Sequence, residues 1–359
     1  MNEYLYPHSP DVIERETLDD GFSKGWALHA KPYPEYFFDC HVHYAGELED
    51  NIAGELAPGL ARVSELDVKR ALILIRTYGE KWEPEDKTVM SPFLSPAQLE
   101  DRLVGFADPF YWAAWIHHYS PEPNLVEAVA KLGASCIKLH NSPVIENNDP
   151  ADLWLNDDWT ATFKAMEKHG LPALFHVTQR LSASRYTGGG RNTYWSAGWE
   201  NGTTYTNEDL LQVFLECCRR YPGINFLGAH QLHIGWPRLE ELFAKHPNLY
   251  VDSTCGCLLK LHDEFYPADK AYLRDVFIRN ADRILWGTDT FWNSKVAANV
   301  DSWYSDYKTY REHIRFIMQL DLPQDVLDKI CYKNSEKLFI KKISCASIQG
   351  PVIAGLTCN

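Results

Sequence analysis

Two histidines separated by one residue, His41 and His43, end an apolar, aromatic run that begins at Tyr36. Side chains alternate along an extended strand, so both imidazoles point to the same face. Two imidazoles side by side cost desolvation and gain little in an apolar core, whereas imidazole nitrogens are common metal ligands. The spacing therefore predicts half of a metal site at the end of a buried strand.

Other apolar runs also end in residues that can bind a metal or move protons. One run carries Lys138 and His140, which share a face by the same alternation. Taken alone, a histidine in an apolar run is more often a core or turn residue with an ordinary partner. Several separate runs with such ends favour a shared site instead, and three further runs end at His176, His230 and Asp289.

The elements that must position these residues are eight short apolar segments, mostly with helical patterns between them. Thr206 and Asp209 predict a capping box at the start of one helix, and a second helix, which carries Trp159 and Phe163, stops before Gly170. Alternating strands and helices predict a parallel sheet with crossover helices. The predicted strands are 36–40, 71–75, 103–107, 135–140, 173–177, 225–230, 249–252 and 284–289.

Eight strand–helix units predict an α/β fold, a single closed (β/α)8 TIM barrel, in which the strand C-termini face the active site. An open, doubly wound sheet is the alternative, but the polar strand ends fit the barrel. The barrel core spans about 36–340 within one domain of residues 1–340, followed by a tail, 341–359, for which we have no physical account. Long connections at 76–101 and 180–206 follow the second and fifth strands, which places both at the catalytic mouth.

Composition limits the classes of partner. A net charge of −14 without a run of basic residues argues against a nucleic-acid surface. No apolar stretch approaches the ~20 residues that cross a bilayer, and the start of the sequence lacks the pattern of a signal peptide. We therefore expect a cytoplasmic protein without nucleic-acid or membrane partners, whose nine scattered cysteines are mostly buried free thiols.

Together, these strand ends resemble the amidohydrolase superfamily. The matching motifs are Asp-Cys-His-Val-His at 39–43, Ile-Lys-Leu-His at 137–140, Leu-Phe-His at 174–176, Gly-Ala-His at 228–230 and Trp-Gly-Thr-Asp at 286–289. The Gly-Thr-Asp and the closing run from Asn334 to Phe339 resemble the amidohydrolase-related branch. That branch contains hydrolases and metal-dependent, non-oxidative decarboxylases. The resemblance covers nearly the whole chain, from Phe38 to about Phe339.

By position, the resemblance implies a ligand set and roles for its members. Zn²⁺ is the expected metal, with Mn²⁺ or Fe²⁺ as alternatives. Asp289 would also take a proton from a metal-activated water, and His230 would polarise or protonate the reacting group. The implied ligands are His41, His43, His176 and Asp289.

Lys138 leaves a second arrangement open. In binuclear members of the superfamily, a carboxylated lysine on this strand bridges two metals, and His176 and His230 would then serve the second metal. Otherwise, Lys138 is an ordinary ammonium that binds a substrate carboxylate or pairs with a nearby acid. One metal is expected, because the branch that the chain resembles usually has one.

The expected substrate is a small molecule, either flat or apolar. The sequence holds 12 tryptophans and 19 tyrosines, and several lie on loops that would surround the mouth. Arginines on those loops can hold a carboxylate, although each is as well explained as a solvated loop charge. The candidate substrate-binding residues are Lys138, His140, Arg76, Arg180, Trp195 and Trp292.

Two reactions fit the same ligands. The first is hydrolysis of an amide, lactone or related carbonyl by metal-activated water. The alternative is non-oxidative decarboxylation of an aromatic or enol-type carboxylic acid. A barrel retained as a non-catalytic binding protein is a third interpretation, which the complete ligand set disfavours. The sequence does not determine the oligomeric state, although barrels of this branch are often dimers, which makes a homodimer possible.

Overall fold

The computed structural model describes residues 32–46, 51–82, 84, 92–178, 205–234, 236–254, 267–292 and 306–340. At its centre is one parallel sheet whose strands are neighbours in chain order. The strands are β1 (Phe37–Tyr44), β2 (Val68–Thr77), β3 (Phe110–Ile116), β4 (Cys136–His140), β5 (Ala173–His176), β6 (Phe226–Gly228), β7 (Leu249–Asp252), β8 (Ile284–Leu285) and β9 (Thr290–Trp292).

The sheet closes on itself through its last strand, which is broken into two pieces. β8 pairs with β7, whereas β9 pairs with β1. Between the two pieces, the N–H of Cys40 donates to the carbonyl of Trp286 (3.1 Å), and the N–H of Asp289 donates to the carbonyl of His41 (2.8 Å). This eighth strand therefore joins the first strand to the seventh, and the predicted (β/α)8 barrel is confirmed.

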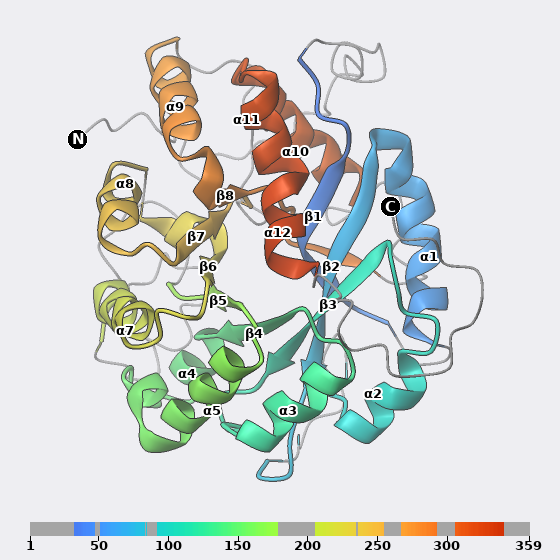
Figure 1. Ribbon diagram of the computed structural model, residues 1–359, viewed down its shortest axis with the longest axis vertical. Helices are drawn as coiled ribbons and strands as arrows, with labels where there is room; N and C mark the ends of the chain where they lie inside the picture. The colour runs from blue at the N-terminus through green and yellow to red at the C-terminus, as the bar shows by residue number, and fades with distance from the viewer. Residues whose placement is uncertain are drawn as a thin grey trace.

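Helices surround the strands on the outside of the barrel (Figure 1). The predicted capping box is present, with Thr206 and Asp209 at the start of α7, and α5 ends at Lys168, before Gly170. The helices are α1 (Ile52–Val63), α2 (Pro96–Arg102), α3 (Pro123–Lys131), α4 (Ser142–Glu146), α5 (Asp157–Lys168), α7 (Asn207–Arg220), α8 (Trp236–Lys245), α9 (Pro267–Arg279), α10 (Asp306–Gln319), α11 (Gln324–Asp328) and α12 (Asn334–Phe339).

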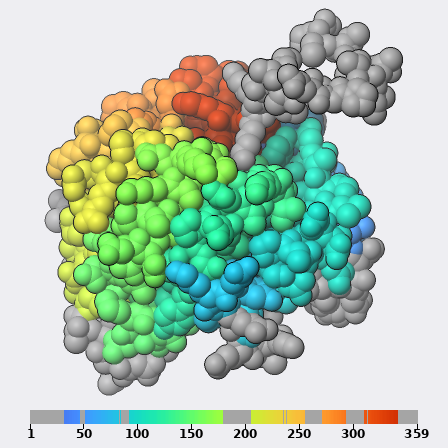
Figure 2. Space-filling model, turned by 60° about the horizontal axis from the view of Figure 1, so that its bottom comes forward, coloured from blue at the N-terminus to red at the C-terminus, as the bar shows by residue number. Residues whose placement is uncertain are grey.

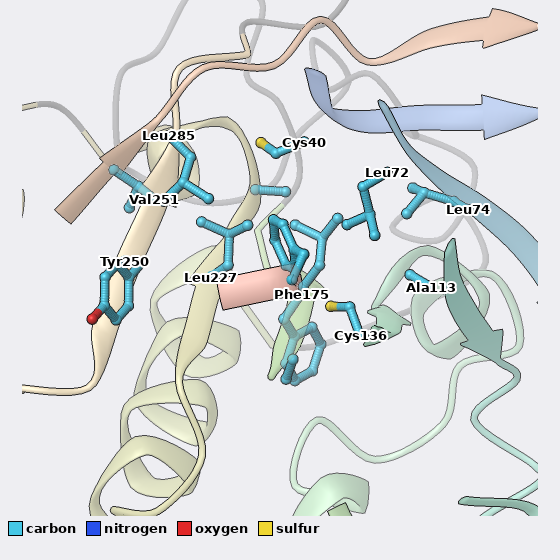
Figure 3. Close-up of a cluster of buried hydrophobic side chains, with 14 of the residues drawn as sticks. Cys40, Leu72, Leu74, Ala113, Cys136, Phe175, Leu227, Tyr250, Val251 and Leu285 are labelled. Atoms are coloured by element: carbon cyan, nitrogen blue, oxygen red, sulfur yellow. The ribbon is translucent and has the colours of Figure 1, made fainter. Parts of the chain in front are cut away.

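Apolar side chains of successive strands form one buried cluster. Figure 3 shows part of it, with Leu72 of β2 and Phe175 of β5 among the labelled side chains. Phe175 packs edge-on against Trp154 and against Phe214 of α7, with ring centroids 4.9 and 5.6 Å apart. Consecutive segments also lie side by side on the surface, where teal, green and yellow follow one another in Figure 2. This dense packing holds the strand ends in fixed positions.

The prediction of the third strand is wrong. Residues 103–107 follow α2 directly and turn at Gly105, which has a φ of +76°. Val104 in this run is 65% exposed, so the run is not a core strand. The third strand is β3, which pairs with β2 from Phe110 to Ile116. A short apolar run does not specify a strand where glycine turns the chain.

The connections at the mouth are described in part. After β2, Leu94 pairs with Thr77 beside the strand end, and α2 follows. Most of the predicted loop at 180–206 lies outside the described residues. Within the part of the chain that the structure describes, no helix combines the length and apolar character needed to cross a membrane.

Candidate metal centre

His41 and His43 both project from β1 toward one carboxylate. Their ring centroids are 5.3 Å apart, and His41 is fully buried. Burial, and then the positive charge of Lys138, hold the pKa of His41 well below its usual range. The imidazole is therefore neutral, which is the form that binds a metal.

Asp289 supplies that carboxylate. Its Oδ1 lies 3.2 Å from Nε2 of His41 and 3.0 Å from Nε2 of His43. The backbone of Asp289 is left-handed, with φ of 61°, and its N–H bond to His41 fixes the residue beside β1. Burial acts to raise the pKa of Asp289, but His41, His43 and the cationic Lys138 together outweigh it, and the pKa lies below its usual value. The carboxylate is thus ionised and ready to bind a cation.

The three ligand atoms fit a metal ion. Bonds of ~2.0–2.1 Å to one ion put neighbouring ligand atoms about 3.0–3.4 Å apart, which matches the separations around Oδ1. Among the described residues, His41, His43 and Asp289 form one of two groups whose potential ligand atoms all lie within 4.8 Å of one another. The other group consists of His41, His230 and Asp252. The seam where the barrel closes therefore carries a candidate metal site.

His176 ends β5 next to these groups without belonging to either. Its Nδ1 lies 3.2 Å from Nε2 of His230, and its ring stacks on His140 with centroids 4.2 Å apart. His140 and His176 are direct partners in the pairing of β4 with β5, which explains why their rings meet. The role of His176 as a further ligand stays a prediction.

Lys138 is fully buried beside the first histidine. Its Nζ lies 3.2 Å from Nε2 of His41. Burial lowers the pKa of Lys138 to about 8, while Asp289 and Asp252 act in the opposite direction. Carboxylation needs a neutral amine, which burial favours, and a buried ammonium needs anions, which the two aspartates supply. The position of Lys138 suits both predicted uses.

His230 reaches the site from a left-handed turn. Residues 230–233 all have positive φ, between 51° and 57°. This conformation costs a residue with a Cβ about 1–2 kcal/mol, so it persists only where the surroundings fix it. The side-chain amide of Gln231 does so by donating to two carbonyls of the segment 252–254, at 2.8 and 2.6 Å. The result is that Nε2 of His230 lies 3.9 Å from Oδ2 of Asp289.

Asp252, which ends β7, was not among the residues predicted from the sequence. This buried carboxylate lies 2.9 Å from Nδ1 of His41 and accepts the backbone N–H of His230 at 2.7 Å. Metal-binding histidines commonly donate their second N–H to such a carboxylate, which fixes the ring. The sequence pattern that predicts such a residue was present, because Asp252 ends an apolar run as Asp289 does.

Asp39 ties the start of the motif to the last strand. It is fully buried and accepts the backbone N–H of Thr288 and of His41, each at 3.0 Å. The hydroxyls of Thr288 and of Tyr310 on α10 donate to its other oxygen. Four donors thus converge on one carboxylate, which holds β1, the segment before Asp289 and α10 together.

Trp115 and Arg76 form a wall beside the candidate ligands. The Trp115 ring lies edge-on to His43 and stacks on His140, with centroids 5.3 and 5.4 Å apart. The guanidinium carbon of Arg76 lies 4.7 Å from the Trp115 ring centroid. Burial lowers the pKa of Arg76 to about 10, so it keeps its charge at neutral pH. The structure brings the predicted residues Arg76 and His140 to the site. It also adds Trp115, which was not predicted because the third strand was expected at 103–107.

The prediction that Trp292 binds substrate is wrong. Its side chain is fully buried and packs against Tyr310 of α10, with ring centroids 6.2 Å apart. A Cβ added to Gly59 of α1 would lie 3.4 Å from the same ring. Trp292 therefore fills the layer between strands and helices. Two other candidates, Arg180 and Trp195, lie outside the described residues.

Comparisons with known proteins agree with this fold. The family model described as amidohydrolase matches residues 38–340. A search of curated proteins found no match. The chain is similar to the solved 5-carboxyvanillate decarboxylase of Sphingomonas paucimobilis, with 11% identity and a TM-score of 0.52 over 85% of this chain and 99% of that one.

Two more solved structures have the same fold. The manganese complex of 5-carboxyvanillate decarboxylase from Novosphingobium aromaticivorans has 13% identity and a TM-score of 0.50, over 85% of this chain and 96% of that one. An uncharacterised TIM-barrel protein from Bordetella bronchiseptica has 13% identity and a TM-score of 0.50, over 84% and 98%. Because the family model spans almost the whole barrel, from β1 to the end of α12, the chain belongs to the amidohydrolase family.

Proposed function

We propose that the protein is a metal-dependent hydrolase that cleaves an amide, lactone or related carbonyl of a small molecule. The observation that carries this proposal is that the two carboxylate oxygens of Asp289 face different side chains. Its Oδ1 lies at the two histidines of β1, while its Oδ2 faces Nε2 of His230 at 3.9 Å. Hydrolysis needs a group that takes a proton from water beside the metal ligands, and Asp289 lies where that group is needed.

The metal would be held by His41, His43, Asp289 and, as a further predicted ligand, His176. When bound, it would supply Lewis acidity and lower the pKa of water to ~7. Nitrogen ligands with one carboxylate suit Zn²⁺, and we propose one ion per chain.

The chain's own residues supply the remaining steps. Asp289 takes the proton at Oδ2, and Nε2 of His230, 3.9 Å away, then receives it. Arg76 holds a negatively charged group of the substrate, and Trp115 provides a flat face against which its apolar part packs. This wall supports a small, flat substrate that carries a carboxylate.

Decarboxylation is the second candidate, because the same wall fits an aromatic carboxylate. Arg76 and Trp115 lie beside His43, so a flat acid bound there would have its carboxylate close to the candidate ligands. The two solved 5-carboxyvanillate decarboxylases show that this fold accommodates such a reaction. In that case no water is consumed.

The origin of the new oxygen separates the two reactions. Metal-loaded protein would be incubated in water labelled with oxygen-18, with aromatic lactones, aryl amides and 5-carboxyvanillate as probes. We expect one labelled oxygen in the product acid of a lactone or amide, as read by mass spectrometry. Release of carbon dioxide from the carboxylate probe, without label in the aromatic product and without turnover of the lactones and amides, would reject hydrolysis in favour of decarboxylation.

Metal content tests the proposed single ion. We expect about one Zn²⁺ per chain by elemental analysis, because one three-residue group already has suitable separations around Oδ1 of Asp289. Lys138→Ala should then keep that ion, provided that circular dichroism shows the variant to be folded. Two ions per chain in the parent protein, with one lost in Lys138→Ala, would show a binuclear site with a carboxylated lysine instead.

A further inference from the structure

One buried carboxylate, that of Asp252, serves two histidines of the site. Its Oδ2 lies 2.9 Å from Nδ1 of His41. Its Oδ1 accepts the backbone N–H of His230 at 2.7 Å and that of Thr254 at 3.2 Å. Backbone N–H groups can only donate, so Asp252 acts as an acceptor here.

Thr254 connects this carboxylate to the ring of His230. The hydroxyl oxygen of Thr254 lies 2.6 Å from Oδ1 of Asp252 and 2.7 Å from Nδ1 of His230. A hydroxyl has one hydrogen, and an ionised carboxylate has none to give. The hydrogen of Thr254 therefore points to Asp252, and its oxygen receives the N–H from Nδ1 of His230. A neutral imidazole that is protonated on Nδ1 has its lone pair on Nε2.

The same reasoning extends to two more rings. Nδ1 of His41 donates to Asp252, which leaves the lone pair on Nε2, where Nζ of Lys138 lies 3.2 Å away and can donate to it. Nε2 of His230 has no hydrogen, so Nδ1 of His176, 3.2 Å away, is the donor of their contact. His176 then also has its lone pair on Nε2.

We propose that Asp252 is a positioning residue that sets the tautomers of three histidines of the site. It acts on His41 directly, and it acts on His230 and then His176 through Thr254. All three rings then carry the proton on Nδ1 and a lone pair on Nε2. Under the proposed function, His230 enters the reaction as a proton acceptor, because a ring without hydrogen on Nε2 cannot polarise a carbonyl by donation.

The tautomers can be read directly in metal-free protein. Nitrogen-15 labelled histidine and two-dimensional NMR distinguish a protonated Nδ1 from a protonated Nε2, and single His→Gln variants assign the signals. We expect protonation on Nδ1 for His41, His230 and His176, although free imidazole side chains prefer the other tautomer. A proton on Nε2 of either His41 or His230 in the parent protein would overturn the proposal, whatever reaction the protein catalyses.

Two variants at Thr254 distinguish an effect of its hydroxyl hydrogen bonds from an effect of side-chain packing. Thr254→Val keeps the shape of the side chain but has no hydroxyl, so we expect His230 and His176 to lose the Nδ1-protonated state while His41 keeps it. Thr254→Ser restores the hydroxyl and should restore all three signals. An unchanged His230 in Thr254→Val would overturn the relay.

Metal affinity gives an independent readout of the direct contact. Asp252→Asn can place an amide N–H against Nδ1 of His41, which moves the ring proton to Nε2 and removes its lone pair. We expect Zn²⁺ affinity to fall ~10–100-fold in competition with a chelator, the range seen when such supporting residues are replaced. Thr254→Ser is the matched control and should bind within about twofold of the parent protein. Parent-like affinity in Asp252→Asn would contradict a role in setting His41.

Discussion

Replacement of Asp289 by asparagine is expected to lower kcat/KM by about 10³-fold and to remove most of the bound metal. The amide keeps the shape of the side chain but loses the charge that faces Nε2 of His41 and of His43. It also loses the oxygen that takes a proton near His230. Loss of a single well-placed electrostatic group alone costs about 10²–10³-fold in rate, and here a proposed metal ligand is lost as well.

His41→Ala should give the same two losses, because it removes the ring that contacts both Asp289 and Asp252. Asp152→Asn, at an exposed position, is the matched control and should keep both activity and metal. Metal would be measured by elemental analysis and folding by circular dichroism. If folded Asp289→Asn and His41→Ala proteins keep full metal and activity, the ligand assignment is wrong.

The second large effect is on stability. Asp39→Ala should lower the free energy of unfolding by about 3–5 kcal/mol, because it leaves buried donors of Thr288, His41 and Tyr310 without an acceptor. Each buried donor without a partner costs about 1–3 kcal/mol, and partial relaxation keeps the total below the simple sum. Urea unfolding of metal-free protein in the presence of a chelator measures this directly.

Asp39→Asn separates shape from charge. The amide oxygen can still accept the two backbone N–H groups, so we expect a loss of about 1–2 kcal/mol. Asp152→Ala should stay within about 0.5 kcal/mol of the parent protein. An Asp39→Ala protein as stable as the Asp152→Ala control would show that the four hydrogen bonds do not tie β1 to the last strand.

The fold could be predicted because strand and helix signals alternate along the chain. The exception is instructive, since residues 103–107 are apolar but turn at Gly105. The true third strand, β3, ends at Ile116 and is followed by two adjacent histidines, His117 and His118, which lack the one-residue separation of His41 and His43. Because the third strand was predicted in the wrong place, Trp115 was not predicted as a site residue, although its neighbour Arg76 was.

The site could be predicted only at strand ends. His41, His43 and Asp289 meet as the alternation of side chains and the closure of the barrel require. Trp292 could not be placed, because the same break that brings Asp289 to β1 starts a new strand, β9, whose last residue packs against helices. The left-handed turn at 230–233 was equally invisible, since none of its residues is glycine and long-range hydrogen bonds hold it.

The broken last strand also determines when the residues of the candidate site come together during synthesis and folding. His43 and Asp289 lie 246 positions apart, and the second is presented only when β8 and β9 have joined both edges of the sheet. During synthesis, the two histidines leave the ribosome early, and their carboxylate partner follows when nearly all of the barrel has been made. An ion bound at this seam would fasten the first and last strands of the finished barrel, and by mass action it would make reopening that seam more costly as free metal rises.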